Sequence, residues 1–224
     1  MHNKKIKGSI AGLALAAVLV GGTFAWLTAE DSIDNAFSTG DNQAEVEIWE
    51  DFDDTNAGKV VPGVAVDKKV KVQNLSTVQS FIRAKLEVTV QSDQESITED
   101  DIILNYSDDV ITKDKINKPI SEYSEKWVEG NDGWFYYIGK VDTEDFTKSD
   151  LLSSVTLSGE VGDVGTVKFN VNVTAENIQT DPSDAVDTWK NEETATNNTS
   201  IISALKVTTG VGSDNAGTGY EETE

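Results

Sequence analysis

The sequence contains no cysteine, a single histidine (His2) and a single methionine (Met1). Without cysteine the protein has no disulfide bond and no thiolate metal site. His2 and Met1 both lie in an N-terminal leader, so its removal leaves no histidine for a Ser-His-Asp or Cys-His constellation or for a zinc motif. Gly-rich phosphate loops and nucleophile elbows are absent as well. We therefore expect neither an enzyme nor a bound cofactor.

Positive charge is also scarce. The chain has 18 basic and 40 acidic residues, which gives a formal charge of −22. Such a chain repels phosphate backbones and anionic lipid, so nucleic acid and membrane surfaces are poor partners. Its length suits one medium-sized domain with a tail.

The first 25 residues have the features of a secretory signal peptide. Three lysines precede an apolar stretch at residues 10–20 (IAGLALAAVLV), which is too short to span a membrane. Signal peptidases require small side chains at the last and third-last positions before the cut, and Ala25 and Thr23 meet this requirement. We expect cleavage before Trp26 and a secreted protein that meets the membrane only before that step. The alternative is an uncleaved N-terminal anchor.

Residues 26–42 form a segment between the leader and the folded domain. Its apolar residues are separated by acidic ones and are too few to form a stable element alone; they are Trp26, Leu27, Ile33, Ala36 and Phe37. Large side chains of this kind contribute about 1.5–3 kcal/mol each when they are buried along an open sheet edge. We expect the segment to complete the sheet of a neighbouring copy. The alternative is that it folds back as the first strand of its own sheet.

Residues 43–190 are expected to form an all-β domain, because apolar and polar residues alternate along most of them. Strands are predicted at residues 44–49, 66–73, 81–90, 151–157 and 167–174, and a hairpin at residues 126–138. The aromatic residues of the hairpin favour core packing over sugar stacking. A possible short helix or turn follows residues 96–99, and one short closing helix is predicted at residues 184–190. This pattern is typical of an antiparallel two-sheet sandwich.

Residues 191–224 are rich in Asn, Thr, Ser, Gly and Glu and are expected to form a disordered tail. Their apolar island at residues 201–207 is an edge strand, a docking segment or an incidental feature, and the last interpretation is favoured.

Acidic residues at 50–58 suggest a loop, in which Asp51, Asp53 and Asp54 are the candidates for calcium ligands. The spacing lacks the third acidic ligand and the glycine of an EF-hand, which favours a solvated acidic loop.

Several motifs in the same order resemble the TasA/camelysin family of exported Gram-positive proteins, which includes the alternate signal-mediated exported proteins. The similarity extends over residues 8–190, and the tail lies outside it. It is carried by residues 21–28 (GGTFAWLT), 35–40 (NAFSTG), 61–63 (VPG), 69–74 (KVKVQN), 81–86 (FIRAKL), 134–137 (WFYY), 173–180 (VTAENIQT) and Trp189.

This resemblance implies processing by a SipW-type signal peptidase, a jelly-roll-like sandwich and a role in the biofilm matrix. In TasA-like members the freed N-terminal segment adds as a strand to the next subunit of a fibre. The resemblance thus implies a homopolymer, with minor matrix subunits as further partners. Camelysin-type members are described as peptidases, and the mature chain has no histidine to hold a zinc ion. A monomeric surface protein with calcium binding or peptidase activity remains the alternative.

Overall fold

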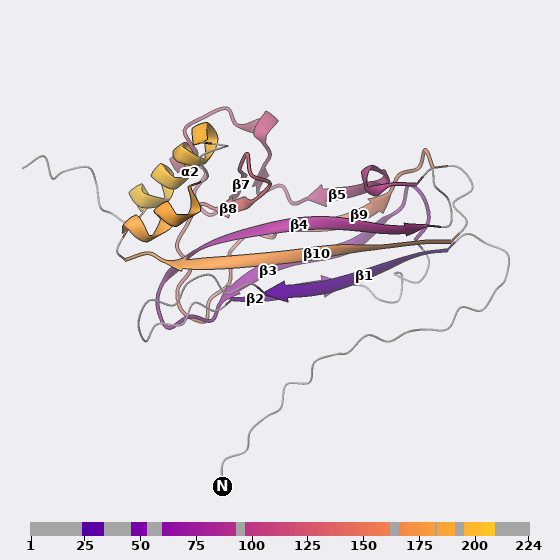
Figure 1. The fold of residues 1–224 in the computed structure, drawn as a ribbon, viewed down its shortest axis with the longest axis horizontal. Coiled ribbons are helices and arrows are strands. Elements are labelled where there is room, and N and C mark those ends of the chain that lie inside the picture. The colour runs from indigo at the N-terminus through magenta and orange to yellow at the C-terminus, as the bar shows by residue number, and fades with distance from the viewer. Residues whose placement is uncertain are drawn as a thin grey trace, which may run out of the picture.

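The computed structural model describes residues 24–33, 46–52, 60–92, 97–161, 166–181, 183–190 and 195–208. In this part of the chain two β-sheets pack face to face, and helical segments cover one end of the larger sheet (Figure 1). The predicted all-β, two-sheet sandwich is confirmed.

The larger sheet has six strands, and two of its pairings are parallel. In spatial order it contains β1 (Phe24–Ile33), β10 (Thr166–Gln179), β4 (Ser80–Ser92), β8 (Phe135–Tyr137), β7 (Trp127–Glu129) and β6 (Val110–Ile111). β1 runs parallel to β10 and β6 parallel to β7, whereas the other neighbours are antiparallel. The sandwich is therefore mainly antiparallel, as predicted, and the prediction fails only for the pairs β1–β10 and β6–β7 among the described strands. Alternation along a strand shows which residues share a face, but it does not show the direction of the neighbouring strand.

The smaller sheet is antiparallel throughout. It contains β2 (Val46–Phe52), β3 (Ala65–Asn74), β9 (Leu152–Leu157) and β5 (Ile102–Tyr106) in that spatial order. The strands predicted from alternation are all present, and the predicted hairpin is formed by β7 and β8.

The main hydrophobic core lies between the sheets. On β4, the predicted core residues Ile82 and Ala84 are fully buried, and Leu86, Val88 and Val90 pack against the same core while partly buried. β10 contributes Val167, Phe169, Val171, Val173 and Ala175. The alternation on both strands arises because every second side chain points into the space between the sheets.

A second hydrophobic cluster, the outer core, covers the other face of the six-stranded sheet at one end. Helix α2 (Ala195–Thr208) and the 3₁₀ helices η4 (Ser183–Trp189) and η3 (Ile120–Glu122) lie over this end (Figure 1). Its buried members include Phe81, Tyr136, Ile178, Val186, Trp189, Ile201, Ile202 and Leu205. The closing helix expected near residues 184–190 is present as η4.

The prediction of a disordered tail is wrong for residues 195–208. The apolar island at residues 201–207 is neither an edge strand nor incidental, because Ile201, Ile202 and Leu205 are buried on one side of α2. Positions i, i+1 and i+4 share one helical face, and this face meets the apolar residues at the end of the larger sheet. The folded domain therefore extends past its predicted boundary at residue 190. Residues 209–224 lie outside the described residues.

Two further 3₁₀ helices occur in connections: η1 (Glu99–Asp101) and η2 (Lys113–Lys115). At η1 the carboxylate of Asp101 accepts a hydrogen bond from the backbone N–H of Thr98 at 2.9 Å. A capping motif thus exists near the predicted position, but Thr98 and Asp101 form it instead of Ser96 and Glu99.

One buried amide joins the two sheets at the end near α2. The Nδ2 group of Asn74, at the end of β3, donates to the backbone oxygens of Val78 and Val141, each at 2.9 Å. Its Oδ1 accepts from the backbone N–H of Ser76 at 3.1 Å and from Nδ2 of Asn177 on β10 at 3.0 Å. This side chain therefore uses both donors and its acceptor, which makes the junction specific as well as stable.

Candidate assembly site

The candidate assembly site is the edge of the six-stranded sheet beside β10, where β1 lies. The pairing runs from Phe24 opposite Thr166 to Ile33 opposite Ala175. On β10, Val167, Phe169 and Val171 are fully or almost fully buried, whereas Lys168 between them is exposed. A strand in this position completes the hydrogen bonding of β10 and covers one edge of the main core.

The structure places part of the predicted donor segment in this position. Trp26, Leu27 and Ile33 belong to β1, whereas Ala36 and Phe37 lie outside the described residues. Leu27 stands opposite the buried Phe169, and Trp26 stands opposite the exposed Lys168. Residues directly opposite one another in neighbouring strands share a face of the sheet. Leu27 therefore occupies a core-side register position and Trp26 an outer-side one.

In this single chain the segment pairs with its own sheet, which is the alternative that the sequence left open. A tethered strand reaches its own edge at a high effective concentration, so self-pairing is the expected state of an isolated chain. β1 is an edge strand, and it lies near β2 at the edge of the facing sheet (Figure 1). Among the described strands, only β10 pairs with it.

The predicted cleavage site falls at the start of β1. Ala25 is the second residue of the strand and Trp26 the third, whereas Thr23 lies outside the described residues. Cleavage between Ala25 and Trp26 would place the new N-terminus within the strand. A terminal strand can leave its sheet without threading the rest of the chain past it.

The acidic segment at residues 50–58 is only partly a loop. Glu50 and Asp51 lie within β2, so the prediction of a loop is wrong for these two residues, while Asp53 and Asp54 lie outside the described residues. Lys68 is fully buried, and its Nζ donates to Oε2 of Glu50 at 2.6 Å. Across the described residues, no three acidic or histidine side chains gather where they could hold a metal ion.

The aromatic residues of the β7–β8 hairpin pack as predicted. The rings of Trp127 and Tyr137 meet edge to face at 5.5 Å between centroids within the core. Tyr136, on the opposite face, donates a hydrogen bond to Oδ2 of Asp132 at 2.7 Å. Burial, and then this hydrogen bond, raise the pKa of Tyr136 above its ordinary value. The aromatic stripe is therefore divided between the main core and the outer core.

Arg83 lies at the centre of a cluster of two tryptophan rings and one carboxylate, which the sequence did not reveal. Its Cζ lies 4.3 Å from the ring centroid of Trp134 and 4.9 Å from that of Trp189. Its Nε and Nη2 donate to Oε2 of Glu176 at 2.9 and 2.6 Å. The contact of Arg83 with Trp189 attaches η4 to the sheet. Arg83 and Glu176 can both lie partly covered beneath η4 because each neutralises the charge of the other. Only the pairing of β4 with β10 and β8 brings these distant residues together.

None of the helices in the described ranges is long and apolar enough to cross a membrane. Comparison with protein-family models, with curated proteins and with solved structures finds no match for this chain.

Proposed function

We propose that this protein is an exported structural subunit that assembles into extracellular fibres, in which each copy receives the N-terminal strand of its neighbour. The observation that carries the proposal is the position of β1: it is the first strand of the described chain and lies at a sheet edge. The same position beside β10 can accept an identical strand from another copy, because main-chain hydrogen bonds provide much of the pairing. The order of the family-like motifs supports the same role.

In this proposal, signal cleavage releases the N-terminal strand for pairing with another copy. Before cleavage the strand continues into an apolar leader, which holds the chain at the membrane. Cleavage before Trp26 frees a strand of about the right length to pair with a neighbour, since β1 continues to Ile33. Processing and assembly are therefore coupled: the unprocessed chain keeps its strand attached to the leader.

Strand exchange adds few contacts that the monomer lacks, because the β10 edge of each copy is covered by a β1 strand both before and after the exchange. A tethered strand has an effective concentration of about the mM range, which favours the closed monomer in dilute solution. Fibres are then expected when the secreted protein is concentrated, or when ends that already carry an open edge are present. A fibre forms when each copy passes its strand to the next copy, whereas two copies that exchange strands with each other form a closed dimer.

Negative-stain electron microscopy of the processed protein at high concentration tests the proposal. We expect fibres from the processed chain and dispersed particles from a chain lacking residues 26–40. The strands from β2 onward keep their own core, so the truncated chain should remain soluble and β-rich by circular dichroism. Fibres from the truncated chain would contradict strand exchange, and its complete unfolding would show that β1 is an indispensable part of its own domain.

Two substitutions on opposite register positions provide a matched comparison within full-length protein. Leu27→Asp places a carboxylate opposite the buried Phe169, whereas Thr28→Asp places the same group opposite the half-buried Asn170. We expect Leu27→Asp to abolish fibres and Thr28→Asp to retain them, because only the first introduces a charge at a core-side position. Equal assembly of the two variants would contradict the pairing register of β1 with β10.

A dispersed monomer whose melting temperature depends on calcium would favour the alternative of a calcium-binding surface protein.

A further inference from the structure

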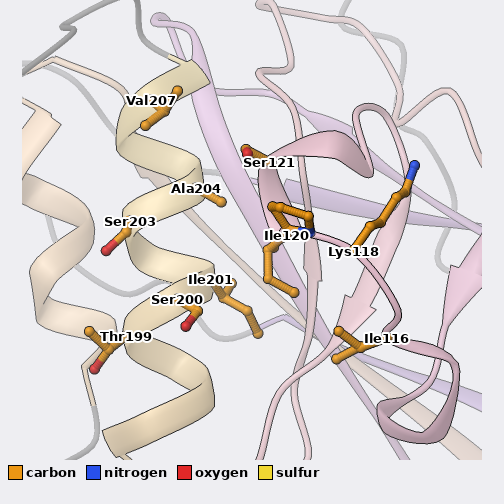
Figure 2. A pocket seen from close by; sticks show the side chains of 11 residues that line it. Ile116, Lys118, Ile120, Ser121, Thr199, Ser200, Ile201, Ser203, Ala204 and Val207 are labelled. Carbon is orange, nitrogen blue, oxygen red and sulfur yellow. The ribbon is translucent and has the colours of Figure 1, made fainter.

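Among the described residues, only Lys68 on β3 combines a charge with complete burial. Lysines usually keep their ammonium group at the surface. Lys118 is an example, because it is exposed beside the groove between α2 and the segment that contains η3 (Figure 2). In contrast, Lys68 lies on the core side of β3, where its Nζ donates to Oε2 of Glu50 on β2 at 2.6 Å. Burial of an ammonium group is costly unless acceptors compensate it, so this lysine points to a specific role.

The facing edge strand, β1, brings one acidic residue to the core side of its sheet. Five of its residues stand opposite buried residues of β10: Ala25, Leu27, Ala29, Asp31 and Ile33. Four of these five are apolar, whereas Asp31 stands opposite the fully buried Val173. A carboxylate at such a position costs free energy unless a donor or a cation compensates it. β1 and β3 therefore contribute opposite charges to the same side of their sheets.

The relative alignment of the two sheets follows from the buried amides at the end near α2. Nδ2 of Asn177 on β10 donates to Oδ1 of Asn74 on β3 at 3.0 Å. β4 starts shortly after the end of β3 and runs antiparallel to β10. Since β4 returns from the end of β3, β3 and β10 run in the same direction in their two layers. Positions at equal distances before the two asparagines are therefore at about the same level.

This alignment brings Asp31 level with the buried lysine pair. Four residues before the two asparagines are Val70 on β3 and Val173 on β10. Glu50 stands opposite Val70, and Asp31 stands opposite Val173. β1 and β2 are edge strands of their sheets and lie near each other. Asp31 and Glu50 thus occupy facing register positions, and Nζ of Lys68 lies at Glu50.

We propose that Lys68 and Glu50 form a register site for the N-terminal strand, in which the ammonium group of Lys68 compensates the carboxylate of Asp31. Its three donors can serve both carboxylates. A slip of β1 by two residues keeps the faces of the strand but moves Asp31 about 7 Å, to a position opposite Val171 or Ala175. The charge then loses its partner, which disfavours the slipped register. The site acts on the chain's own β1, and its action on a neighbour's strand rests on the proposed function.

Disulfide formation between introduced cysteines can report the register of β1, because the protein has no cysteine of its own. Thr28 stands directly opposite Asn170, and Lys168 is two residues away along β10. Neighbouring strands are about 4.8 Å apart, so Thr28→Cys with Asn170→Cys is within disulfide range. Thr28→Cys with Lys168→Cys is about 8 Å apart and reaches this range only when β1 slips. Both pairs are oxidised in dispersed full-length monomer, and the intramolecular disulfide is measured by intact mass.

We expect the Asn170→Cys pair to form its disulfide at least about tenfold faster than the Lys168→Cys pair. Asp31→Ala should reduce this preference at least about threefold, because an apolar residue fits every core-side position. The matched control is Glu30→Ala, which removes the neighbouring acid at an outer-side position opposite Asn172 and should leave the preference unchanged.

Lys68→Met should reduce the preference as Asp31→Ala does, and the two changes together should reduce it no further, because they remove the same interaction. An unchanged preference in Asp31→Ala would overturn the proposal even if Lys68→Met failed to fold. Equal effects of Asp31→Ala and Glu30→Ala would overturn it too, as would equal rates for the two cysteine pairs in the parent chain. Since the measurement is made within dispersed monomer, its result is independent of fibre formation.

Discussion

The packing of α2 can be measured with one buried and one exposed residue of the same helix. Ile201 is fully buried in the outer core, whereas Val207 is 60% exposed. Replacing each with alanine removes a β-branched side chain from the same helix. The two changes alter helix propensity by similar amounts, so the difference between them reports packing.

The expected magnitude follows from burial. Truncation of a fully buried isoleucine to alanine costs about 2–5 kcal/mol, because transfer energy is lost and a cavity remains. We take about 3 kcal/mol for Ile201→Ala. With a urea m-value of about 2 kcal/mol per M for a domain of this size, the unfolding midpoint falls by about 1.5 M. Val207→Ala should change stability by less than about 0.5 kcal/mol.

Urea denaturation is followed by tryptophan fluorescence and by circular dichroism. Trp189 lies in the outer core beside α2, so its fluorescence responds when the helix detaches. If α2 detaches before the sandwich unfolds, Ile201→Ala lowers the midpoint of that first transition. Coincident curves for Ile201→Ala and Val207→Ala would refute the packing of α2 against the sheet.

Four further predictions concern other parts of the molecule. Asn74→Ala should lower the free energy of unfolding by about 2 kcal/mol in urea denaturation, because the buried carbonyls of Val78 and Val141 each lose one donor and the backbone N–H of Ser76 loses its acceptor; a smaller loss than at an exposed asparagine such as Asn117 would contradict this. Hydrogen bonds to Asp184 and then Asp187 raise the pKa of Lys206, so its contribution is present below the ordinary lysine pKa of 10.5 and is lost as the pH rises through the raised value. Burial opposes ionisation of Asp187, but hydrogen bonds from Lys206 and Lys190 outweigh it and lower the pKa of Asp187, so its contribution is present above 3.8 and is lost as the pH falls through the lowered value. The protection factors of the α2 amides, which compare the exchange rate with the intrinsic rate at the same pH, should therefore fall below pH 3.8 and above pH 10.5, by an amount equivalent to about 0.5–1 kcal/mol, and Lys206→Met should flatten this dependence; an unchanged profile in the variant would exclude the ion pairs as its cause. N-terminal sequencing of the exported protein should begin at Trp26, whereas a start at Glu30 or retention of Met1 would remove the basis of the free strand. Finally, EDTA should leave the melting temperature unchanged, since a mature chain without His or Cys lacks the ligands that zinc prefers; a drop would reveal a calcium site among the acidic residues.

The long strands could be predicted because their signal is local. In β4 and β10 every second residue is apolar, and the same residues face the main core in the structure. A strand buried on one face requires this alternation whatever its neighbours are. For the same reason the aromatic hairpin and η4 were found near their predicted positions.

Helix α2 could not be predicted from a local pattern of apolar residues. Its sequence is rich in Asn, Thr and Ser, and only Ile201, Ile202 and Leu205 supply the buried face. Such a helix is marginal alone, and most of its stability comes from the outer core against which it packs. That surface is assembled from β4, β8, β10 and η4, which are distant in sequence.

The candidate assembly site shows the same division. The sequence by itself led to the predictions of a signal peptide and of a cleavage site marked by Thr23 and Ala25, and it showed the scarcity of His and Cys and the interrupted apolar segment that follows. The tertiary structure alone decided that β1 lies parallel to β10 at a sheet edge, with Leu27 rather than Trp26 at the core-side register position. It also decided that Arg83 meets Trp134 and Trp189. Strand direction, register and such long-range contacts depend on which segments become neighbours, and a local pattern of residues does not encode that choice.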